Sequence, residues 1–295
     1  MWMNAAHIRI MTKTLFSFGH GYSARALATL LRRSGDWHII GTTRDARKAD
    51  ELASDGTEAL IWPGTAVAPA LARATHLLIS AGPGEDGDPV LAAVGDDIAR
   101  AVPHLEWAGY LSTTGVYGDH GGGWVEEETP LDPGTRRGEL RQEAEAAWQS
   151  IPDLPLHIFR LAGIYGPGRG PFAKVRAGTA RRIIKAGQVF SRIHVDDIAQ
   201  VLAASINAPD PGAVYNVCDD DPAPPEDVIG FAAELLGLPL PEAVAFDEAE
   251  MSPMARSFYA ESKRVTNDRI KRELGVTLRY PSYRDGLPAM MDAED

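Results

Sequence analysis

The sequence contains a single cysteine, Cys218, among its 295 residues. A disulfide within the chain is therefore excluded, and such sparse use of cysteine is typical of a reducing compartment. No apolar run approaches the ~20 residues that a transmembrane helix needs. The N-terminal segment MWMNAAHIRIMTK lacks the apolar core of a signal peptide and predicts a short leader before the first strand. Together these absences predict a cytoplasmic protein that does not bind membranes.

Basic residues are in the minority, since 29 Lys and Arg stand against 41 Asp and Glu, for a net charge of −12. This charge argues against general binding to nucleic acid or anionic lipid, because both are negatively charged themselves. It leaves room for an anionic small molecule held by a local arginine cluster. No residues have metal-ligand spacing: we interpret Asp196 and Asp197 as helix caps and 219–221 as a solvated turn at a strand end. We therefore expect a small-molecule ligand and no metal.

Short apolar runs alternate with helical patterns through the first two thirds of the chain. The run TLFSF, for example, precedes the helical pattern SARALATLLRRSG. Such alternation is typical of βαβ units and predicts an α/β fold, a doubly wound parallel sheet (Rossmann fold) covered by helices on both faces. The predicted strands are residues 14–18, 37–42, 58–62, 76–81, 109–113, 156–161 and 213–217.

After Asp219 the regular alternation ends, and helical patterns dominate. We assign residues 1–165 and 192–220 to the nucleotide-binding core. Residues 166–191 and 221–295 are assigned to a small, mostly helical C-terminal cap that binds the substrate. The predicted substrate site lies between this cap and the carboxyl edge of the sheet.

The segment FGHGYSA places Gly19-x-Gly21-x-x-Ala24 between the first strand and its helix. In the dinucleotide fingerprint, the first glycine allows a tight turn and the second lets a pyrophosphate approach the backbone. The small third residue lets helix and strand pack closely, and the free N–H groups of the helix start attract phosphate. Gly19, Gly21, Tyr22 and Ser23 are therefore the candidate pyrophosphate-binding residues. The alternative is a plain tight turn.

The end of the second strand reads GTTRDAR. An NAD site places Asp or Glu there to bind the ribose hydroxyls. In this chain Thr43 and Arg44 come first, and a guanidinium can bind a 2′-phosphate with two hydrogen bonds. We therefore expect NADP in preference to NAD. The alternative is that Arg44 is a surface arginine and that Asp45 binds the ribose.

Three later stretches, together with the glycine loop, resemble the extended short-chain dehydrogenase/reductase family, in its NAD-dependent epimerase/dehydratase branch. LSTTGVYGDHGGGWVEEETPLDP, from Leu111, resembles the segment after the family's fifth strand. RLAGIYGPGRG, from Arg160, resembles the segment after the sixth strand, and SRIHVDDIAQVL, from Ser191, the segment that enters the helix before the last core strand. The resemblance covers nearly the whole chain. It implies the fold and the cofactor class, and much less about the substrate.

The resemblance also implies a role for each matching residue. Thr113 takes the place of the Ser or Thr that hydrogen-bonds the reacting hydroxyl or carbonyl. A structural role is the alternative in each case, such as capping a strand end, packing in the core or, for a lone histidine, a buried hydrogen bond. The other implied positions are Ala81, Gly82 and Pro83 beside the adenine-side ribose, Ile164 and Tyr165 beside the nicotinamide, and Arg192 and His194 beside the substrate.

The family carries its catalytic Tyr-x-x-x-Lys pair on the helix after the fifth strand. Here that helix reads RGELRQEAE, so Arg137 stands at the tyrosine position and Arg141 at the lysine position. The tyrosine gives or takes a proton during hydride transfer, and the lysine lowers its pKa. Arginine stays protonated and cannot relay that proton, although it can bind an anion or stabilise an oxyanion. Tyr117 is the nearby phenol and is retained as a candidate proton donor, although its position in relatives belongs mostly to the loop wall.

These expectations describe an atypical member of the family that prefers NADP and acts on a nucleotide sugar or another polar anionic carbonyl compound. The reaction would be an epimerisation, dehydration or reduction assisted by Thr113 and Arg137. A non-catalytic NADP(H)-binding sensor or scaffold is the alternative that the missing proton relay favours. A third hypothesis is an NAD-dependent sugar epimerase with a displaced base. The resemblance is also compatible with a homodimer.

Overall fold

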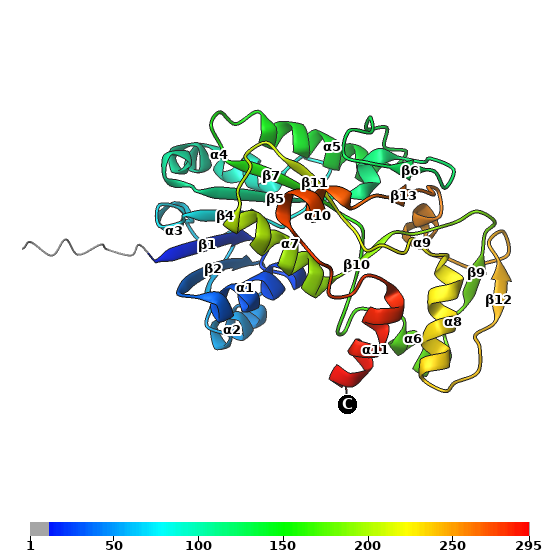
Figure 1. Cartoon of the computed structure of the whole chain (residues 1–295). Coiled ribbons are helices and arrows are strands. Elements are labelled where there is room, and N and C mark those ends of the chain that lie inside the picture. Colours follow the sequence, from blue (N-terminus) through cyan, green and yellow to red (C-terminus); the bar gives the residue numbers. More distant parts are fainter. Residues whose placement is uncertain (1–11, 295) are drawn as a thin grey trace, which may run out of the picture.

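The structure is a computed structural model that describes residues 12–294. The expected leader therefore lies almost entirely outside the described residues. Seven parallel strands form the central sheet in the order β11-β7-β5-β4-β1-β2-β3 (Figure 1). This order confirms the predicted doubly wound Rossmann-type fold. Strands β2 and β3 are added on one side of β1, and β4, β5, β7 and β11 on the other, so the strand order reverses between β1 and β4. The strands are β1 Lys13–Phe18, β2 Trp37–Thr43, β3 Glu58–Ile61, β4 His76–Ile79, β5 Trp107–Thr113, β7 Leu156–Leu161 and β11 Val214–Val217.

The central strands are apolar on both faces because helices cover both sides of the sheet. Every residue of β7 is buried, and so is every residue of β1 after Lys13. One hydrophobic core packs under α1 Tyr22–Ser34, α7 Val195–Asn207 and α10 Asp268–Leu274. The other core packs under α3 Ala68–Leu71, α4 Pro89–Ala101 and α5 Arg136–Gln149, whereas α2 Ala46–Ser54 lies against the outer strands (Figure 1).

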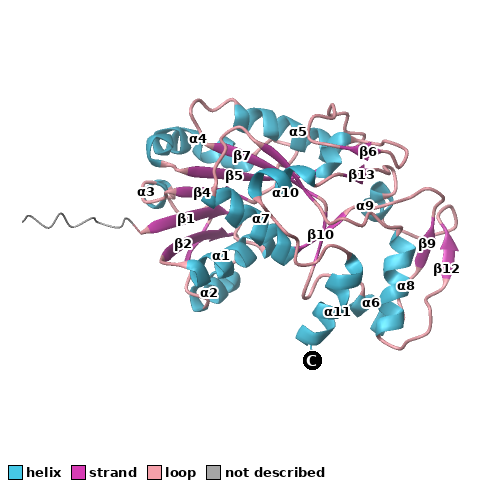
Figure 2. Cartoon of the chain, viewed as in Figure 1, coloured by secondary structure: helices cyan, strands magenta, loops and turns pink. Residues whose placement is uncertain are grey.

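The cap forms the second part of the molecule and has its own small core. That core brings together Phe172, Val228, Tyr283 and Leu287 from three helices. Figure 2 shows that short strands accompany the helices of the cap. The remaining elements are β6 Trp124–Val125, β8 Gly163–Tyr165, α6 Phe172–Arg176, β9 Arg182–Ile184, β10 Arg192–His194, α8 Pro225–Leu235, β12 Ala243–Ala245, α9 Pro253–Phe258, β13 Arg264–Val265 and α11 Tyr283–Glu294, with short 3₁₀ helices at Val102–His104 and Thr114–Tyr117.

Part of the segment assigned to the cap packs on the nucleotide-binding core instead. Val265, Ile270 and Leu278 belong to the core under α1 and α7. β13 pairs with β6, which follows the fifth strand of the central sheet. The chain therefore leaves the core after β11 and returns to it at β13. Among the helices of residues 12–294, none is both long and apolar enough to cross a membrane.

Candidate functional site

The glycine loop lies at the carboxyl end of β1, against the end of β4. Gly19 has a φ of 75°, and its N–H donates a 2.8 Å hydrogen bond to the Thr42 hydroxyl. A Cβ at this position would lie 2.9 Å from the backbone nitrogen of Ala81. Gly21 directly precedes α1 and has no side chain to cap it, so the first N–H groups of the helix remain available. The loop thus has the geometry that a pyrophosphate group requires.

A cleft of about 1010 Å³ runs from this loop to the cap. It opens at the carboxyl edge of the sheet, where ligands bind in doubly wound folds. The structure brings ten of the predicted site residues together along its wall, although they come from five separate segments. These residues are Gly19, Gly21, Tyr22, Ser23, Thr113, Arg137, Arg141, Ile164, Tyr165 and Arg192.

Seven predicted residues do not line this cleft. Ala81 touches the glycine loop, Gly82 lies under the Arg141 side chain, and Thr43 lines a neighbouring groove of about 880 Å³ between α1 and α2. Arg44 is exposed and forms no hydrogen bond or ion pair with the part of the chain that the structure describes. The other three are Pro83, Tyr117 and His194.

Arg141 is held firmly against the sheet. Its Nη1 donates a hydrogen bond to the carbonyl of Leu111, and its guanidinium lies 5.7 Å from the centre of the Tyr110 ring. A Cβ on Gly82 would come within 2.8 Å of its Nη2, so the glycine makes room for it. The side chain therefore forms part of the cleft wall, with a fixed positive charge at the ends of β4 and β5.

Arg137 has a different environment, one turn earlier on the same helix. It is exposed, and it forms no hydrogen bond or ion pair with the described residues. Its guanidinium instead lies 6.0 Å from the centre of the Phe258 ring on the cap. Gly138 lets helix α5 pack closely on the turn after β5, since a Cβ at this position would lie 2.9 Å from the carbonyl oxygen of Gly115. Arg137 is thus a free cation that faces the cap across the cleft.

Thr113 ends β5 and lines the cleft. Its hydroxyl oxygen accepts a 3.2 Å hydrogen bond from the N–H of Gly115. The hydroxyl proton therefore remains available to a ligand. This placement is compatible with both expectations for Thr113, which are a contact to the reacting group and a cap of the strand end.

Tyr117 lies away from the cleft in a buried polar network. Its hydroxyl donates to Asn216 Oδ1 at 2.7 Å and accepts from Arg160 Nη1 at 2.9 Å. Burial raises the pKa of this phenol to about 12. Arg160 in turn forms a buried ion pair with Glu145 at 2.9 Å. The phenol is fully engaged inside the protein, and this position offers no support for the expected proton donor.

His194 is buried and caps a helix. Its Nδ1 accepts a 3.2 Å hydrogen bond from the N–H of Asp196 at the start of α7, and burial lowers its pKa. The expected cap residues were Asp196 and Asp197, so this interpretation is corrected. Asp197 instead accepts hydrogen bonds from the N–H groups of Arg279 and Tyr280, at 2.7 and 3.0 Å. His194 is therefore a structural residue in this fold, in line with the alternative given for it.

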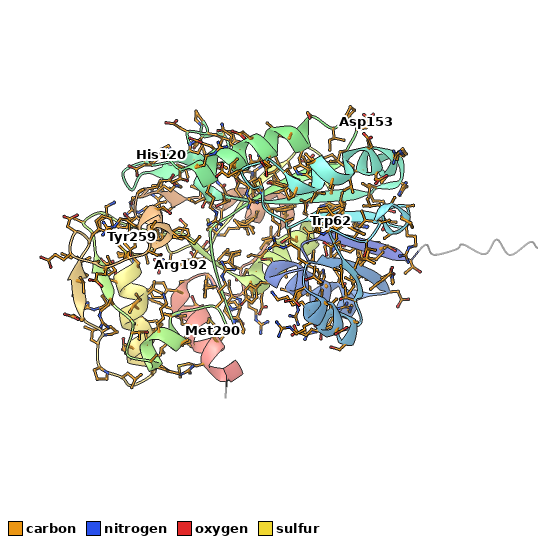
Figure 3. All side chains as sticks on the ribbon, turned by 180° about the vertical axis from the view of Figure 1, so that it is seen from behind. Trp62, His120, Asp153, Arg192, Tyr259 and Met290 are labelled. Atoms are coloured by element: carbon orange, nitrogen blue, oxygen red, sulfur yellow. The ribbon has the colours of Figure 1, made fainter. Side chains whose placement is uncertain are left out.

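Arg192 lies at the junction of core and cap, near Tyr259 (Figure 3). Its Nη1 donates to the carbonyls of Phe190 and Ala223, at 2.8 and 3.0 Å. Burial lowers its pKa, an effect that Asp219 partly offsets. Asp219 was expected in a solvated turn, but it is only 1% exposed, and this burial raises its pKa to about 8. Arg192 thus uses one guanidinium nitrogen to hold two segments of the cap together.

Several residues of the cleft were not predicted from the sequence. Arg169 lies within the quoted RLAGIYGPGRG motif, which is the one signal that could have indicated it. Lys263 donates 2.6 Å hydrogen bonds to the carbonyl of Gly118 and to Glu261. The segment around Lys263 has no regular pattern of apolar residues, so nothing in its sequence places it at the cleft. Met254, Phe258 and Tyr259 reach the cleft from the same segment.

The cleft is positively charged, in contrast to the chain as a whole. Arg137, Arg141, Arg169, Arg192 and Lys263 line it, and Glu261 is the single acidic residue among the described residues of its wall. The chain carries a net charge of −12. Basic residues are thus concentrated where an anionic ligand would bind. No group of three or more potential metal-ligating side chains occurs in residues 12–294.

Comparison with known sequences finds relatives along nearly the whole chain. Protein YeeZ of Escherichia coli K12 is 30% identical over 279 residues, which cover 89% of this chain and 94% of that protein. A 3-diazoavenalumate denitrifying reductase of a Streptomyces species is 31% identical over 185 residues, or 55% of this chain and 58% of the reductase. No family model matches.

Comparison with solved structures identifies the same fold in proteins of known name. A conserved protein of unknown function from Silicibacter pomeroyi is 63% identical, with a TM-score of 0.92 over 96% of this chain and 99% of the other. The UDP-glucuronic acid 4-epimerase of Bacillus cereus, solved in complex with NAD, is 17% identical, with a TM-score of 0.75 over 95% of this chain and 96% of the other. The chain belongs to the family of Protein YeeZ and has the Rossmann-type fold of the NAD-dependent epimerases and dehydratases.

Proposed function

We propose that this chain is an NADP(H)-dependent oxidoreductase, an atypical extended short-chain dehydrogenase/reductase. Its substrate is a nucleotide sugar or another polar anionic carbonyl compound. One observation carries the proposal: a single cleft contains both the glycine loop and the free cation Arg137, and its wall is positively charged. A dinucleotide and an anionic substrate would together neutralise that charge. The similarity to a reductase over part of the chain supports the same reaction class.

The residues present fit a bound dinucleotide. Gly19 and Gly21 leave space for a pyrophosphate beside the uncapped start of α1, where Tyr22 and Ser23 begin the helix. Ile164 and Tyr165 line the cleft on the nicotinamide side. The bound cofactor supplies or accepts the hydride.

The chain's own residues position the substrate and stabilise charge. The Thr113 hydroxyl, which already accepts from Gly115 N–H, has its proton free to donate to a carbonyl oxygen. Arg137 binds the anionic part of the substrate or stabilises an oxyanion. Arg141 contributes a fixed positive charge at the strand ends, where its contact with Leu111 holds it.

The surroundings of Arg44 support NADP. The alternative partner for an NAD ribose, Asp45, uses its carboxylate to accept the N–H groups of Arg47 and Lys48, which caps α2. Arg44 itself is exposed and has no partner among the described residues. An unpaired guanidinium at the end of β2 suits a 2′-phosphate.

A fluorescence titration with NADPH and NADH tests the cofactor. Loss of a charge-assisted hydrogen-bond pair costs about 1.5–3 kcal/mol, so Arg44→Ala is expected to weaken NADPH binding about tenfold or more and to leave NADH binding unchanged. Arg47→Ala is the matched control, because it removes a neighbouring arginine whose side chain is 91% exposed. Equal binding of both cofactors, or a preference for NADH, would contradict the NADP assignment. Absence of binding would overturn the proposed function.

The second candidate function is a non-catalytic NADP(H) sensor or scaffold. Two observations favour it: the Tyr117 phenol is buried in a network, and Arg141 is bound to backbone, so neither provides a proton relay in the cleft. Turnover of a carbonyl compound with consumption of NADPH separates the two functions. If turnover occurs and falls in Arg137→Ala, the sensor function is excluded.

A further inference from the structure

The cap presents two large apolar side chains to the cleft. Met254 and Phe258 stand four residues apart on α9, so they share one face of the helix. They are 69% and 54% exposed, and both line the cleft. Single exposed apolar residues are common on proteins, but two on one face of a ligand cleft indicate a binding surface.

A packed aromatic cluster adjoins this surface, and two of its members, Phe190 and Tyr259, also line the cleft. Tyr259 follows α9 and is 8% exposed. Its ring lies 5.4 Å from the ring of Phe190, edge to face, and 5.4 Å from the ring of Phe246. Contacts of this kind fix the orientation of aromatic rings. The apolar face of the cleft therefore lies beside a defined cluster that joins three cap segments.

Several polar side chains of the same wall form hydrogen bonds within the protein. Arg192 donates to two backbone carbonyls, and Lys263 donates to a carbonyl and to Glu261. The Ser257 hydroxyl donates to the carbonyl of Met254 at 2.8 Å. A nucleoside and a sugar need many hydrogen bonds from their site, and these three side chains already use part of their hydrogen-bonding capacity within the protein.

Arg137 complements the apolar surface from the opposite side of the cleft. It has no hydrogen-bond or ion-pair partner in the described part of the chain, and its guanidinium lies 6.0 Å from the Phe258 ring. A guanidinium binds a carboxylate with two parallel hydrogen bonds and can keep an aromatic ring beside it. One ligand can therefore use both features at once.

We propose that the substrate is a carboxylic acid with a flat aromatic or conjugated body. Its carboxylate binds Arg137, and its ring lies against Met254 and Phe258. This inference rests on the proposed function and selects one of its two substrate classes, the anionic carbonyl compound over the nucleotide sugar. The apolar body explains why exposed methionine and phenylalanine side chains line a cleft that is otherwise positively charged.

Isothermal titration of the full chain with trans-cinnamate tests the inference, with and without NADP⁺. Cinnamamide, which has the ring without the charge, and UDP-glucose serve as comparison ligands. We expect cinnamate to bind at least tenfold more tightly than either. Arg137→Met is expected to weaken cinnamate binding about tenfold, and Phe258→Ala about threefold to tenfold.

Two control variants match these substitutions. Arg136→Met removes the neighbouring arginine, which pairs with Glu85 and Glu139 and does not line the cleft. Trp124→Ala removes an aromatic side chain that is 60% exposed elsewhere. Both controls are expected to bind cinnamate like the unaltered chain. Circular dichroism on each variant verifies the fold.

The outcomes separate this inference from the proposed function. If UDP-glucose binds more tightly than cinnamate, the inference is overturned. It is also overturned if Arg136→Met weakens the binding of cinnamate as much as Arg137→Met does. If cinnamate does not bind while NADPH does, the inference also fails, and the cofactor assignment stands. If cinnamate binds in the predicted way without any NADP(H) binding, the ligand class is supported and the oxidoreductase function is refuted.

Discussion

The buried ion pair between Arg160 and Glu145 connects helix α5 to strand β7. Their side chains are 7% and 3% exposed, and Nη2 of Arg160 lies 2.9 Å from Oε2 of Glu145. The Ser112 hydroxyl also donates to Glu145, and Arg160 also donates to the Tyr117 hydroxyl. This network holds α5, the helix that carries Arg137 and Arg141. Disruption of this network should therefore lower the free energy of unfolding.

Glu145→Gln keeps the shape of the side chain and removes its charge. It leaves the Arg160 guanidinium uncompensated in the interior, which costs about 3–5 kcal/mol. The unfolding entropy of a chain of this length is about 0.6 kcal/mol/K, from ~2.1 cal/mol/K per residue. The melting temperature should therefore fall by about 5–8 °C, measured by differential scanning calorimetry.

Glu143→Gln is the matched control on the same helix. Glu143 is 63% exposed and lies 3.5 Å from Arg136, so its loss should cost less than about 0.5 kcal/mol. The double variant Glu145→Leu with Arg160→Met removes both charges and should recover part of the loss. If Glu145→Gln and Glu143→Gln lower the melting temperature equally, the reasoning about the buried pair is refuted.

Three further predictions concern the loop, a buried histidine and the Tyr117 network. Gly19→Ala should lower the free energy of unfolding by about 1–3 kcal/mol, measured in urea, and weaken NADPH binding. The reasons are the positive φ of Gly19 and the clash of a new Cβ with the backbone of Ala81. Gly178→Ala is the control, because Gly178 has a φ of 66° but open space around it. His20 is buried with its pKa lowered from 6.5 to about 4, so the unfolded chain binds a proton first and stability falls as the pH drops from 6.5 to 4. His20→Asn should remove about 2 kcal/mol of the loss between pH 7 and pH 5, and an unchanged loss would contradict this. Tyr117→Phe should cost about 1–3 kcal/mol of stability and leave NADPH binding intact; a large loss of turnover at unchanged stability would instead support its role as proton donor.

The sequence by itself determined the fold and the glycine loop. The alternation of apolar runs and helical patterns is a local signal, because parallel strands covered on both faces must be apolar throughout. The loop at Gly19 and Gly21 is also local, since turn geometry and helix start depend on neighbouring residues. The spacing of Arg137 and Arg141 predicted that they share one helix face, and the resemblance to the family predicted that this face lines the cleft, where the structure places both.

Only the tertiary structure decided what the two arginines do. Arg141 is bound by Leu111 and accommodated by Gly82, whereas Arg137 is left free to face Phe258. Similarly, His194 caps the start of α7, and the Tyr117 hydroxyl is hydrogen-bonded to Asn216 and Arg160 in the interior. These outcomes depend on which distant segments pack together, and sequence periodicity carries no record of such contacts. For the same reason, the α9 segment and Lys263 could be placed at the cleft only once the chain had folded back onto its core.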